Sequence, residues 1–322
     1  MKKIGVLTSG GDAPGMNAAV RAAVRCGIDK GMEVYGIRRG FEGLIDGEIS
    51  KMEWHSVGDI LQRGGTILRT ARSSRFMEDR WVEHGARMLE AFGIEGLIIV
   101  GGDGSFRGGV ELASKGISVM GVPGTIDNDL AYTDYTIGFD TAVNTSLGLI
   151  TNIRDTSSSH QRTTIMEVMG RHCGDLALYS GLAGGADVIL VPEVKCDINE
   201  ICRRVLQGQS TGKAHSLIVM AEGFDMDSSE LAKILEEMTG REARAVVPGY
   251  IQRGGSPTEK DRRLATVTAA KAVDLLYNES ESKAIGVSRG ELIELDLAEA
   301  LHMEPVFRSD LYELANVLGK GR

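Results

Sequence analysis

Several features that mark whole classes of protein are scarce or missing in this sequence. Aromatic residues make up only 5% of its 322 residues, which disfavours the stacking surfaces that bind single-stranded nucleic acid. The formal net charge of −9 also argues against a nucleic acid or an anionic membrane as a partner. No apolar run approaches the roughly 18 residues that span a bilayer, and the apolar run that opens the chain is too short for a signal peptide. We therefore predict a cytoplasmic protein that binds neither membranes nor nucleic acids.

Cysteine and histidine are too scattered to form a disulfide framework or a metal site of known spacing. Cys26, Cys173, Cys196 and Cys202 show no CxxC pair, and the six histidines show no HExxH. Neither a Walker A motif nor a strict GxGxxG is present. We expect reduced thiols, and any phosphate site must be of another kind.

Glycine, in contrast, is abundant at 42 residues. Short β-branched runs that end near glycine or proline alternate with stretches of helical apolar spacing, a pattern that predicts parallel α/β sheets. Such sheets bind ligands at the carboxyl ends of their strands. The length favours two domains, with a change near residue 138, where YTIGFD opens a long helix. The predicted strands are KIGVLTSGG, GLIIVGGDG, SVMGVPGT, TTIMEVMGR, DVILVPE, SLIVMAEG and ARAVVPGY.

Three loops at these strand ends are suited to binding phosphate. TSGGDAPGMN (8–17) and GGDGSFRGG (101–109) each follow a strand and open a helix, so their backbone amides and the helix dipole form an anion site. The second loop adds Asp103, a candidate Mg²⁺ ligand. The third, GVPGTIDND, places Asp127 and Asp129 one residue apart, with no lysine or arginine for several residues on either side. One glycine loop is commonly only a tight turn, but three together favour phosphate chemistry.

Arginines supply the complementary charge. The guanidinium group matches phosphate geometry in a bidentate way, although any one of these arginines by itself is more commonly a solvated surface residue. The candidates are Arg72, Arg162, Arg171, Arg244 and Arg253.

Seven motifs occur in a characteristic order over essentially the whole chain: GVLTSGGDAPGMNA, GGDGS, PGTIDND, YTIGFDTA, RDTSSSHQR, EVMGR and GYIQRGGSP. In this order they resemble bacterial 6-phosphofructokinases of the ATP-dependent type. NAD kinases and diacylglycerol kinases share a loop like GGDG, but TIDND together with MGR and IQRGGSP distinguishes the phosphofructokinases. The resemblance implies two Rossmann-like three-layer α/β/α domains with mostly parallel sheets. It implies an ATP-binding domain (1–138 plus about 252–302), a fructose 6-phosphate domain (139–251 plus about 303–322) and a homotetramer.

The resemblance also implies a reaction: transfer of the γ-phosphate of ATP, with Mg²⁺, to the 1-hydroxyl of fructose 6-phosphate in glycolysis. Asp127 is the implied base, which a neighbouring arginine would make less basic. Thr125 and Arg171 are implied to meet the transferring group, and Asp103 and Asp129 to attend Mg²⁺. Nucleotide binding is implied for Gly11, Arg72, Gly102, Asp103, Gly104 and Ser105. Substrate binding is implied for Thr125, Asp127, Arg162, Met169, Gly170, Arg171, Glu222, Arg244, Tyr250 and Arg253, with Arg162 and Arg244 coming from a neighbouring subunit.

The sequence departs from the family at several positions. Tyr250 stands where a histidine is common, and Phe41 replaces a tyrosine near adenine. SSRFMEDRW (73–81) is unusual, so we expect no nucleotide contact there. An effector pocket for ADP or phosphoenolpyruvate is implied for Arg21, Arg25, Arg154, Gly185, Asp187, Lys213 and His215.

Substitutions around this effector pocket predict weakened control of the activity by ADP and phosphoenolpyruvate. Trp54, Thr211 and Ala214 occupy positions that are usually basic, and Asp187 replaces a glutamate. Control would persist if Arg203 or Arg204 reached the effector, or if Trp54 stacked on it.

Two alternative functions stay open. Pyrophosphate-dependent enzymes of the same family typically carry aspartate at the second glycine of GGDG and lysine before TIDND, whereas Gly104 and Gly124 leave room for a nucleotide here. A catalytically silent sugar-phosphate sensor or regulatory subunit would have lost Asp127, Arg171 or Asp103, and all three are present.

Overall fold

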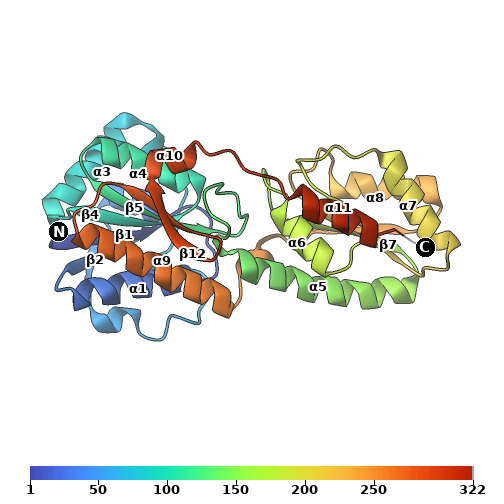
Figure 1. Cartoon of the computed structure of the whole chain (residues 1–322), viewed down its shortest axis with the longest axis horizontal. Coiled ribbons are helices and arrows are strands. Elements are labelled where there is room, and N and C mark those ends of the chain that lie inside the picture. The colour runs from blue at the N-terminus through green and yellow to red at the C-terminus, as the bar shows by residue number, and fades with distance from the viewer. Residues whose placement is uncertain (321–322) are drawn as a thin grey trace. The chain divides into compact units, whose positions relative to one another are not determined.

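The computed structural model describes residues 1–320, which divide into two compact units (Figure 1). Unit 1 comprises Met1–Thr141 and Arg253–Pro305. Unit 2 comprises Ala142–Gln252 and the C-terminal segment that begins at Val306. Each unit is therefore assembled from two separate stretches of the chain.

Unit 1 is built on an eight-stranded sheet with the path order β12-β11-β5-β4-β1-β2-β3, to which the short β6 adds beside β5. The inner pairs are parallel, and only the pairs β2–β3 and β11–β12 at the two ends are antiparallel. The strands are β1 (Lys3–Thr8), β2 (Glu33–Ile37), β3 (Ile49–Met52), β4 (Gly96–Gly101), β5 (Ser118–Thr125), β6 (Ile137–Gly138), β11 (Lys283–Ser288) and β12 (Glu291–Asp296).

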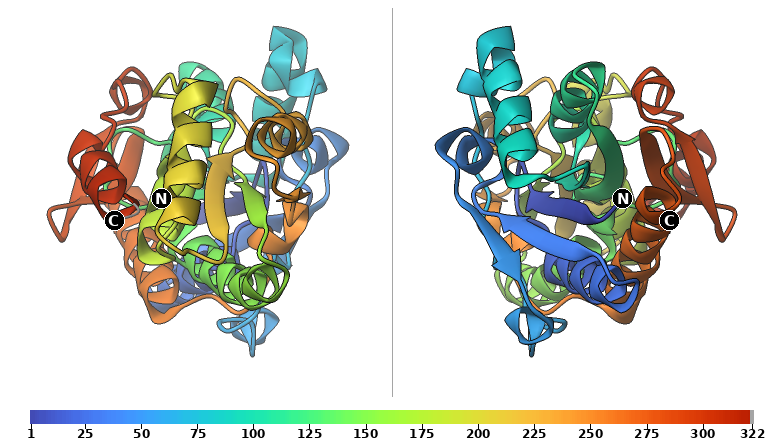
Figure 2. Two further views of the ribbon diagram at one scale, coloured as in Figure 1. Left: turned by 90° about the vertical axis from the view of Figure 1, so that its right-hand side faces the viewer. Right: turned by 90° about the vertical axis from the view of Figure 1, so that its left-hand side faces the viewer.

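Helices cover both faces of this sheet, as the right-hand view of Figure 2 shows. α1 and α9 pack side by side on one face, while α3, α4 and α10 lie on the other. The elements are α1 (Met16–Asp29), α2 (Gly40–Asp46), α3 (Asp79–Phe92), α4 (Asp103–Ser114), α9 (Glu259–Tyr277) and α10 (Leu297–Leu301), with 3₁₀ turns η1 (Trp54–Val57) and η2 (Arg75–Met77).

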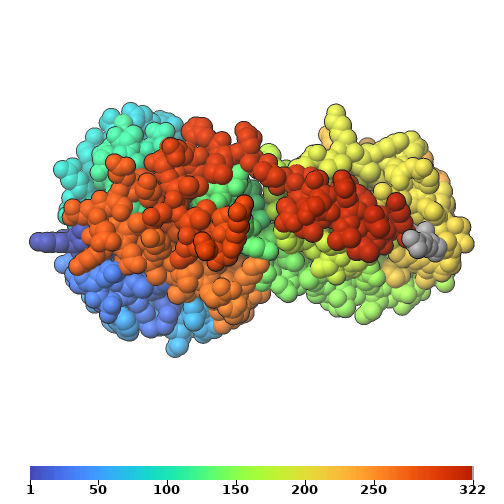
Figure 3. Space-filling view, in the orientation of Figure 1, coloured from blue at the N-terminus to red at the C-terminus, as the bar shows by residue number. Residues whose placement is uncertain are grey.

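Unit 2 has a smaller, fully parallel sheet with the order β10-β7-β9-β8. α7 and α8 share a buried apolar core with one face of the sheet, whereas Gly181 brings α6 close to Ile189 and Val219 on the other. α11 packs on α6 and β8 at the surface of the unit, where Figure 3 shows it in red. The elements are β7 (Thr163–Val168), β8 (Val188–Leu190), β9 (Ser216–Ala221), β10 (Ala243–Val246), α6 (Asp175–Ala183), α7 (Ile198–Ser210), α8 (Ser228–Thr239) and α11 (Ser309–Leu318). Two further elements lie mostly in unit 2: α5 (Phe139–His160), whose first three residues belong to unit 1, and η3 (Gly249–Arg253), whose last residue does.

The predicted fold class is confirmed. All seven predicted strand segments are strands, and the long helix predicted to open at YTIGFD is α5. β2, β3, β6, β11 and β12 are not among the predicted strands. Of these, β6 has only two residues, and β3 and β12 lie at the ends of the sheet. Within residues 1–320, none of the four cysteines forms a disulfide. No helix within residues 1–320 is both long enough and apolar enough to cross a membrane.

A buried carboxylate in α9 fixes the start of α5. The Asp261 side chain accepts hydrogen bonds from the backbone N–H groups of Gly138 (2.9 Å) and Thr141 (2.8 Å). Such amides at the start of a helix have no partner within the helix itself. Burial raises the pKa of Asp261. The first turn of α5 is thereby anchored to α9, a segment more than a hundred residues away in the sequence.

Candidate active site

A cavity of about 760 Å³ opens at the carboxyl ends of β1, β4 and β5 in unit 1. These three strands are neighbours in the sheet, so the loops that follow them meet at one edge. The predicted nucleotide residues Gly11, Arg72, Gly102, Asp103, Gly104 and Ser105 all line the cavity, together with Thr125, Asp127 and Arg253. The structure therefore gathers residues of all three predicted phosphate loops, together with Arg72 and Arg253, around one space.

The loop after β1 is shaped by glycine and held by its neighbours. Gly10 has a φ of 85°, a conformation that favours glycine, and any side chain at Gly11 would overlap the Arg253 guanidinium. The Thr70 hydroxyl donates to the Gly10 carbonyl at 2.6 Å, and the side chain of Asn17 accepts from the N–H of Ile67 at 2.8 Å. These hydrogen bonds hold residues 67–70 against the loop, and Arg72, which follows them, lines the cavity.

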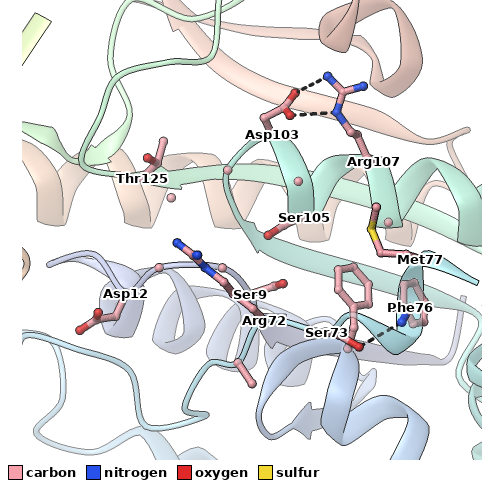
Figure 4. A pocket seen from close by; sticks show the side chains of 18 of the residues that line it. Ser9, Asp12, Arg72, Ser73, Phe76, Met77, Asp103, Ser105, Arg107 and Thr125 are labelled. Carbon is pink, nitrogen blue, oxygen red and sulfur yellow. Dashed lines mark hydrogen bonds and ion pairs between the residues drawn. The ribbon is translucent and has the colours of Figure 1, made fainter. Parts of the chain in front are cut away.

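The loop after β4 leads directly into α4, whose first turn borders the cavity. Gly104 has no atom within 4 Å of the position that a Cβ would occupy, so a larger residue there would project into open space. Asp103 is held by Arg107 through a bidentate pair, with Nε to Oδ2 at 2.9 Å and a second N–H to Oδ1 at 3.1 Å (Figure 4). Arg107 was absent from the predicted site, although its position four residues after Asp103 on a helix was the available signal.

The TIDND loop is fixed by backbone and amide contacts. The Asp127 N–H donates to the Thr125 hydroxyl at 3.2 Å, and the Thr136 hydroxyl donates to the Thr125 carbonyl at 2.7 Å. Asn128 has a φ of 54°, and its side-chain oxygen accepts from the N–H of Thr136 at 3.0 Å. Asp127 and Asp129 both line the cavity. The sequence shows no cation near Asp127, but the fold brings Arg253 to the same cavity from a distant segment.

One end of the cavity is aromatic. Phe41 and Phe76 stack with ring centroids 4.2 Å apart and an interplanar angle of 18°, and both are about 5% exposed. Ser73, Phe76, Met77 and Asp79, from the segment for which no nucleotide contact is expected, also line the cavity. Figure 4 shows Phe76 and Met77 toward one end, and Thr125 and Asp12 toward the other.

An ion-pair network holds this aromatic wall in place. The Arg75 guanidinium pairs with Glu42 and lies 2.9 Å from Asp46, both in α2. The Arg75 interaction holds the pKa of Glu42 below its usual value. Because Arg75 lies in η2 beside Phe76, the network ties the aromatic residue to the helix that carries Phe41.

In unit 2, a second group of predicted residues gathers at the carboxyl edge of the sheet. Met169, Gly170 and Arg171 follow β7, and Glu222 follows the neighbouring β9, with its N–H 2.8 Å from the Val168 carbonyl. Gly170 has a φ of 119°, and a side chain at Gly223 would overlap the Arg171 carbonyl. Tyr250, 81% exposed, follows β10 at this same edge.

Arg162 and Arg244 lie at the opposite edge of this sheet. Arg162 immediately precedes β7, and Arg244 pairs in register with Thr164 near the start of that strand. Since β7 is six residues long, the two edges are about 20 Å apart. Arg244 pairs with Glu242 at 2.8 Å, and this bond, aided by the charge of Arg162, lowers the pKa of Glu242. The structure thus separates these two arginines from Met169, Gly170, Arg171 and Glu222 within one chain.

The predicted effector residues of unit 2 cluster before β8 and β9. Lys213 pairs with Asp187, whose other oxygen accepts from the N–H of Leu217 at 2.9 Å. Arg154 donates to the carbonyl of Gly185. Burial, followed by the charges of Arg154 and Lys213, lowers the pKa of His215.

The remaining two effector candidates, Arg21 and Arg25, lie on α1 of unit 1. The Arg25 guanidinium carbon is 4.9 Å from the centre of the Trp54 ring, within the range of a cation–π contact.

Known proteins that are similar to this chain belong to the family that the motifs indicate. The family model described as phosphofructokinase matches residues 3–276, most of the chain. The chain belongs to the phosphofructokinase family. The ATP-dependent 6-phosphofructokinase of Clostridium botulinum is 55% identical over 320 residues, covering 99% of this chain and all of that protein. The enzyme of the same name from Clostridium tetani is 55% identical over 318 residues, covering 99% of each chain.

Solved structures of the family share the fold. The phosphofructokinase of Saccharomyces cerevisiae matches 99% of this chain with a TM-score of 0.87 and 35% identity. The chain spans about half of that yeast chain, covering 47% of it. A pyrophosphate-dependent phosphofructokinase from Marinobacter aquaeolei has a TM-score of 0.83 at 22% identity, which shows a common fold and no more. The family resemblance inferred from the motifs is therefore confirmed.

Proposed function

We propose that this family member transfers the γ-phosphoryl group of ATP to the 1-hydroxyl of fructose 6-phosphate, giving fructose 1,6-bisphosphate in glycolysis in the cytoplasm. One observation carries the proposal: a single cavity is lined by two glycine-rich helix-opening loops and by Asp127. The 55% identity to proteins named ATP-dependent 6-phosphofructokinase supports the same reaction.

The shape of the cavity supports an orientation for the nucleotide. The aromatic end, with Phe76 and Met77, offers an apolar surface for a base. The loops that contain Gly11 and Gly104 offer backbone amides for the phosphates, and Arg72 adds a positive charge. The terminal phosphate then points toward Thr125 and Asp127.

Asp127 is proposed to accept the proton of the sugar 1-hydroxyl as that oxygen attacks phosphorus. Thr125 and Arg171 are proposed to stabilise the charge of the transferring group. Because phosphoryl transfer gains most from positioning and charge stabilisation, these contacts matter as much as the base.

The residues present fit a nucleotide-bound Mg²⁺. Asp103 and Asp129 line the cavity, and we propose that they hold the ion. Within residues 1–320, no group of three or more acidic, cysteine or histidine side chains is arranged to hold a metal by itself. Mg²⁺ at kinase sites commonly takes only one or two carboxylates and otherwise phosphate and water oxygens. When bound, the ion would neutralise charge on the phosphates.

Residues are likewise assigned to binding of the sugar phosphate. Met169, Gly170 and Glu222 are assigned to the sugar, and Tyr250 and Arg253 to its phosphate. Arg162 and Arg244 are assigned to the phosphate bound by another subunit of a homotetramer. Their position at the far edge of the unit 2 sheet supports this assignment, because a single chain separates them from Met169 by about 20 Å.

The direct test is a coupled assay of the purified protein with fructose 6-phosphate and Mg²⁺, offering ATP or pyrophosphate in turn. We expect turnover of fructose 6-phosphate when ATP is the phosphoryl donor but not when pyrophosphate is, since the open space at Gly104 admits a nucleotide. Turnover with pyrophosphate alone would identify the pyrophosphate-dependent reaction instead. Binding of fructose 6-phosphate without turnover on either donor would identify a sugar-phosphate sensor.

We further propose that control by phosphoenolpyruvate and ADP is weak. Asp187 is already bonded to Lys213 and the backbone, Arg154 to Gly185, and Arg25 stacks on Trp54. A charge-assisted hydrogen bond contributes about 1.5 to 3 kcal/mol, and a typical allosteric coupling is only about 1 to 3 kcal/mol. Loss of two or three effector contacts therefore suffices to remove the coupling.

Weak control predicts a fructose 6-phosphate saturation curve, measured near neutral pH, that changes little when millimolar phosphoenolpyruvate is added. The alternative route through Arg204 is disfavoured, because that side chain is bonded to Glu200 (3.1 Å) and Asn316 (2.8 Å). A strong sigmoidal shift that ADP reverses would contradict the prediction.

A further inference from the structure

The Asp103–Arg107 pair is unusual among the ion pairs of unit 1, because both of its members line the nucleotide cavity. Both carboxylate oxygens of Asp103 accept from the guanidinium, at 2.9 and 3.1 Å. The two residues are four apart on α4, so the helix itself holds them in reach of each other. Figure 4 shows the pair beside the cavity.

This pairing conflicts with the role proposed for Asp103. A carboxylate that holds a divalent cation must turn its oxygens to the metal, yet here both oxygens face a guanidinium. The pair is partly exposed, with side-chain exposures of 41% for Asp103 and 66% for Arg107, so its net stability is small. A nucleotide-bound cation therefore has only a weak ion pair to displace.

We propose that Arg107 is a positioning residue that neutralises Asp103 until a metal–nucleotide complex arrives, and then yields the carboxylate to the metal. In the free enzyme, Arg107 compensates the negative charge of Asp103 beside the phosphate site. Metal-free ATP consequently meets less repulsion than it would beside a bare Asp103 carboxylate. Arg107 thereby narrows the difference in affinity between metal-free and metal-loaded nucleotide. This inference rests on the proposed function of the cavity.

The test measures binding rather than turnover. Isothermal titration calorimetry gives the Kd of ATP in excess EDTA and the Kd of ATP with saturating Mn²⁺, for the full-length wild type and for Arg107→Ala. We expect the Kd of metal-free ATP, divided by the Kd of ATP with Mn²⁺, to rise about three- to tenfold in Arg107→Ala. A change of this size is typical of the repulsion between partly exposed charges a few ångströms apart. Arg107→Lys, which keeps the charge but loses the bidentate fork, should give an intermediate ratio.

A matched control is available on α9. Arg263 forms an ion pair of the same spacing with Glu259 at 2.7 Å, but neither residue lines the cavity. Arg263→Ala should leave the ratio unchanged, which separates the proposed role from a general effect of losing a helix ion pair.

The outcomes are distinguishable. An unchanged ratio in Arg107→Ala, with a wild type that binds ATP and phosphorylates fructose 6-phosphate, overturns the inference and leaves the proposed function standing. An equal loss of affinity for both forms of ATP assigns Arg107 to direct nucleotide binding and also overturns it. A wild type that binds neither form overturns the proposed function itself.

Discussion

Asp127→Asn is expected to lower kcat by on the order of 10² to 10⁴, the usual contribution of a positioned general base. Asparagine has nearly the same shape as aspartate, so the Thr125–Thr136 contacts of the loop should persist. It has no basic oxygen to take the proton of the sugar hydroxyl. The measurement is steady-state turnover with fructose 6-phosphate and ATP, combined with calorimetry of ATP binding, which should change little.

Asp29→Asn provides the control for this experiment. Asp29 is exposed at the end of α1, so its substitution removes the same charge from a position in unit 1 away from the cavity. It should retain wild-type turnover. If Asp127→Asn kept as much as a third of wild-type kcat, another group would have to be the base.

Mixing two inactive variants is expected to restore activity, which is the second large effect. Arg162→Ala removes a phosphate contact that we assign to a neighbouring subunit, and Asp127→Asn removes the base. In a hybrid assembly, one composite site receives an intact Asp127 and an intact Arg162 from different chains. The measurement is turnover after subunit exchange, compared with each variant incubated alone.

The reason for expecting rescue lies in the unit 2 sheet. Arg162 and Arg244 stand at its amino edge, while Met169 and Arg171 stand at its carboxyl edge. Exchange must be verified independently, for example by mass spectrometry of tagged subunits. Absence of any recovery after verified exchange would mean that each site is completed within one chain, contrary to the proposal.

Much of the fold follows from local patterns in the sequence. Buried parallel strands such as β4 read as continuous apolar runs, and their glycine-rich ends mark the ligand-binding edge. The end strands β3 and β12 could not be predicted in this way. β12, ELIELD, has an acidic residue at every second or third position and little buried surface, so its pairing depends on β11 rather than on its own hydrophobicity.

The candidate site likewise contains residues that the sequence predicts and residues that it does not. Loop residues such as Gly11, Asp103 and Asp127 follow strands directly, so the sequence places them at the sheet edge. Phe76 reaches the cavity through the Arg75 ion pairs with α2, a contact between segments more than 25 residues apart. The approach of Arg253 to Gly11 spans most of the chain. Such contacts depend on tertiary packing, which no short stretch of sequence encodes.

The stacking of Phe41 on Phe76 has a consequence for the thermodynamics of binding. Both rings are buried and fixed by their neighbours before any nucleotide enters, with Phe41 packed against Gly108 and Phe76 held by the segment that Arg75 anchors. A wall whose side chains are already ordered loses little rotamer entropy when a ligand binds. The conformational cost of binding on these two rings thus falls mainly on the nucleotide, whose rotation about its own bonds is restricted when it packs there.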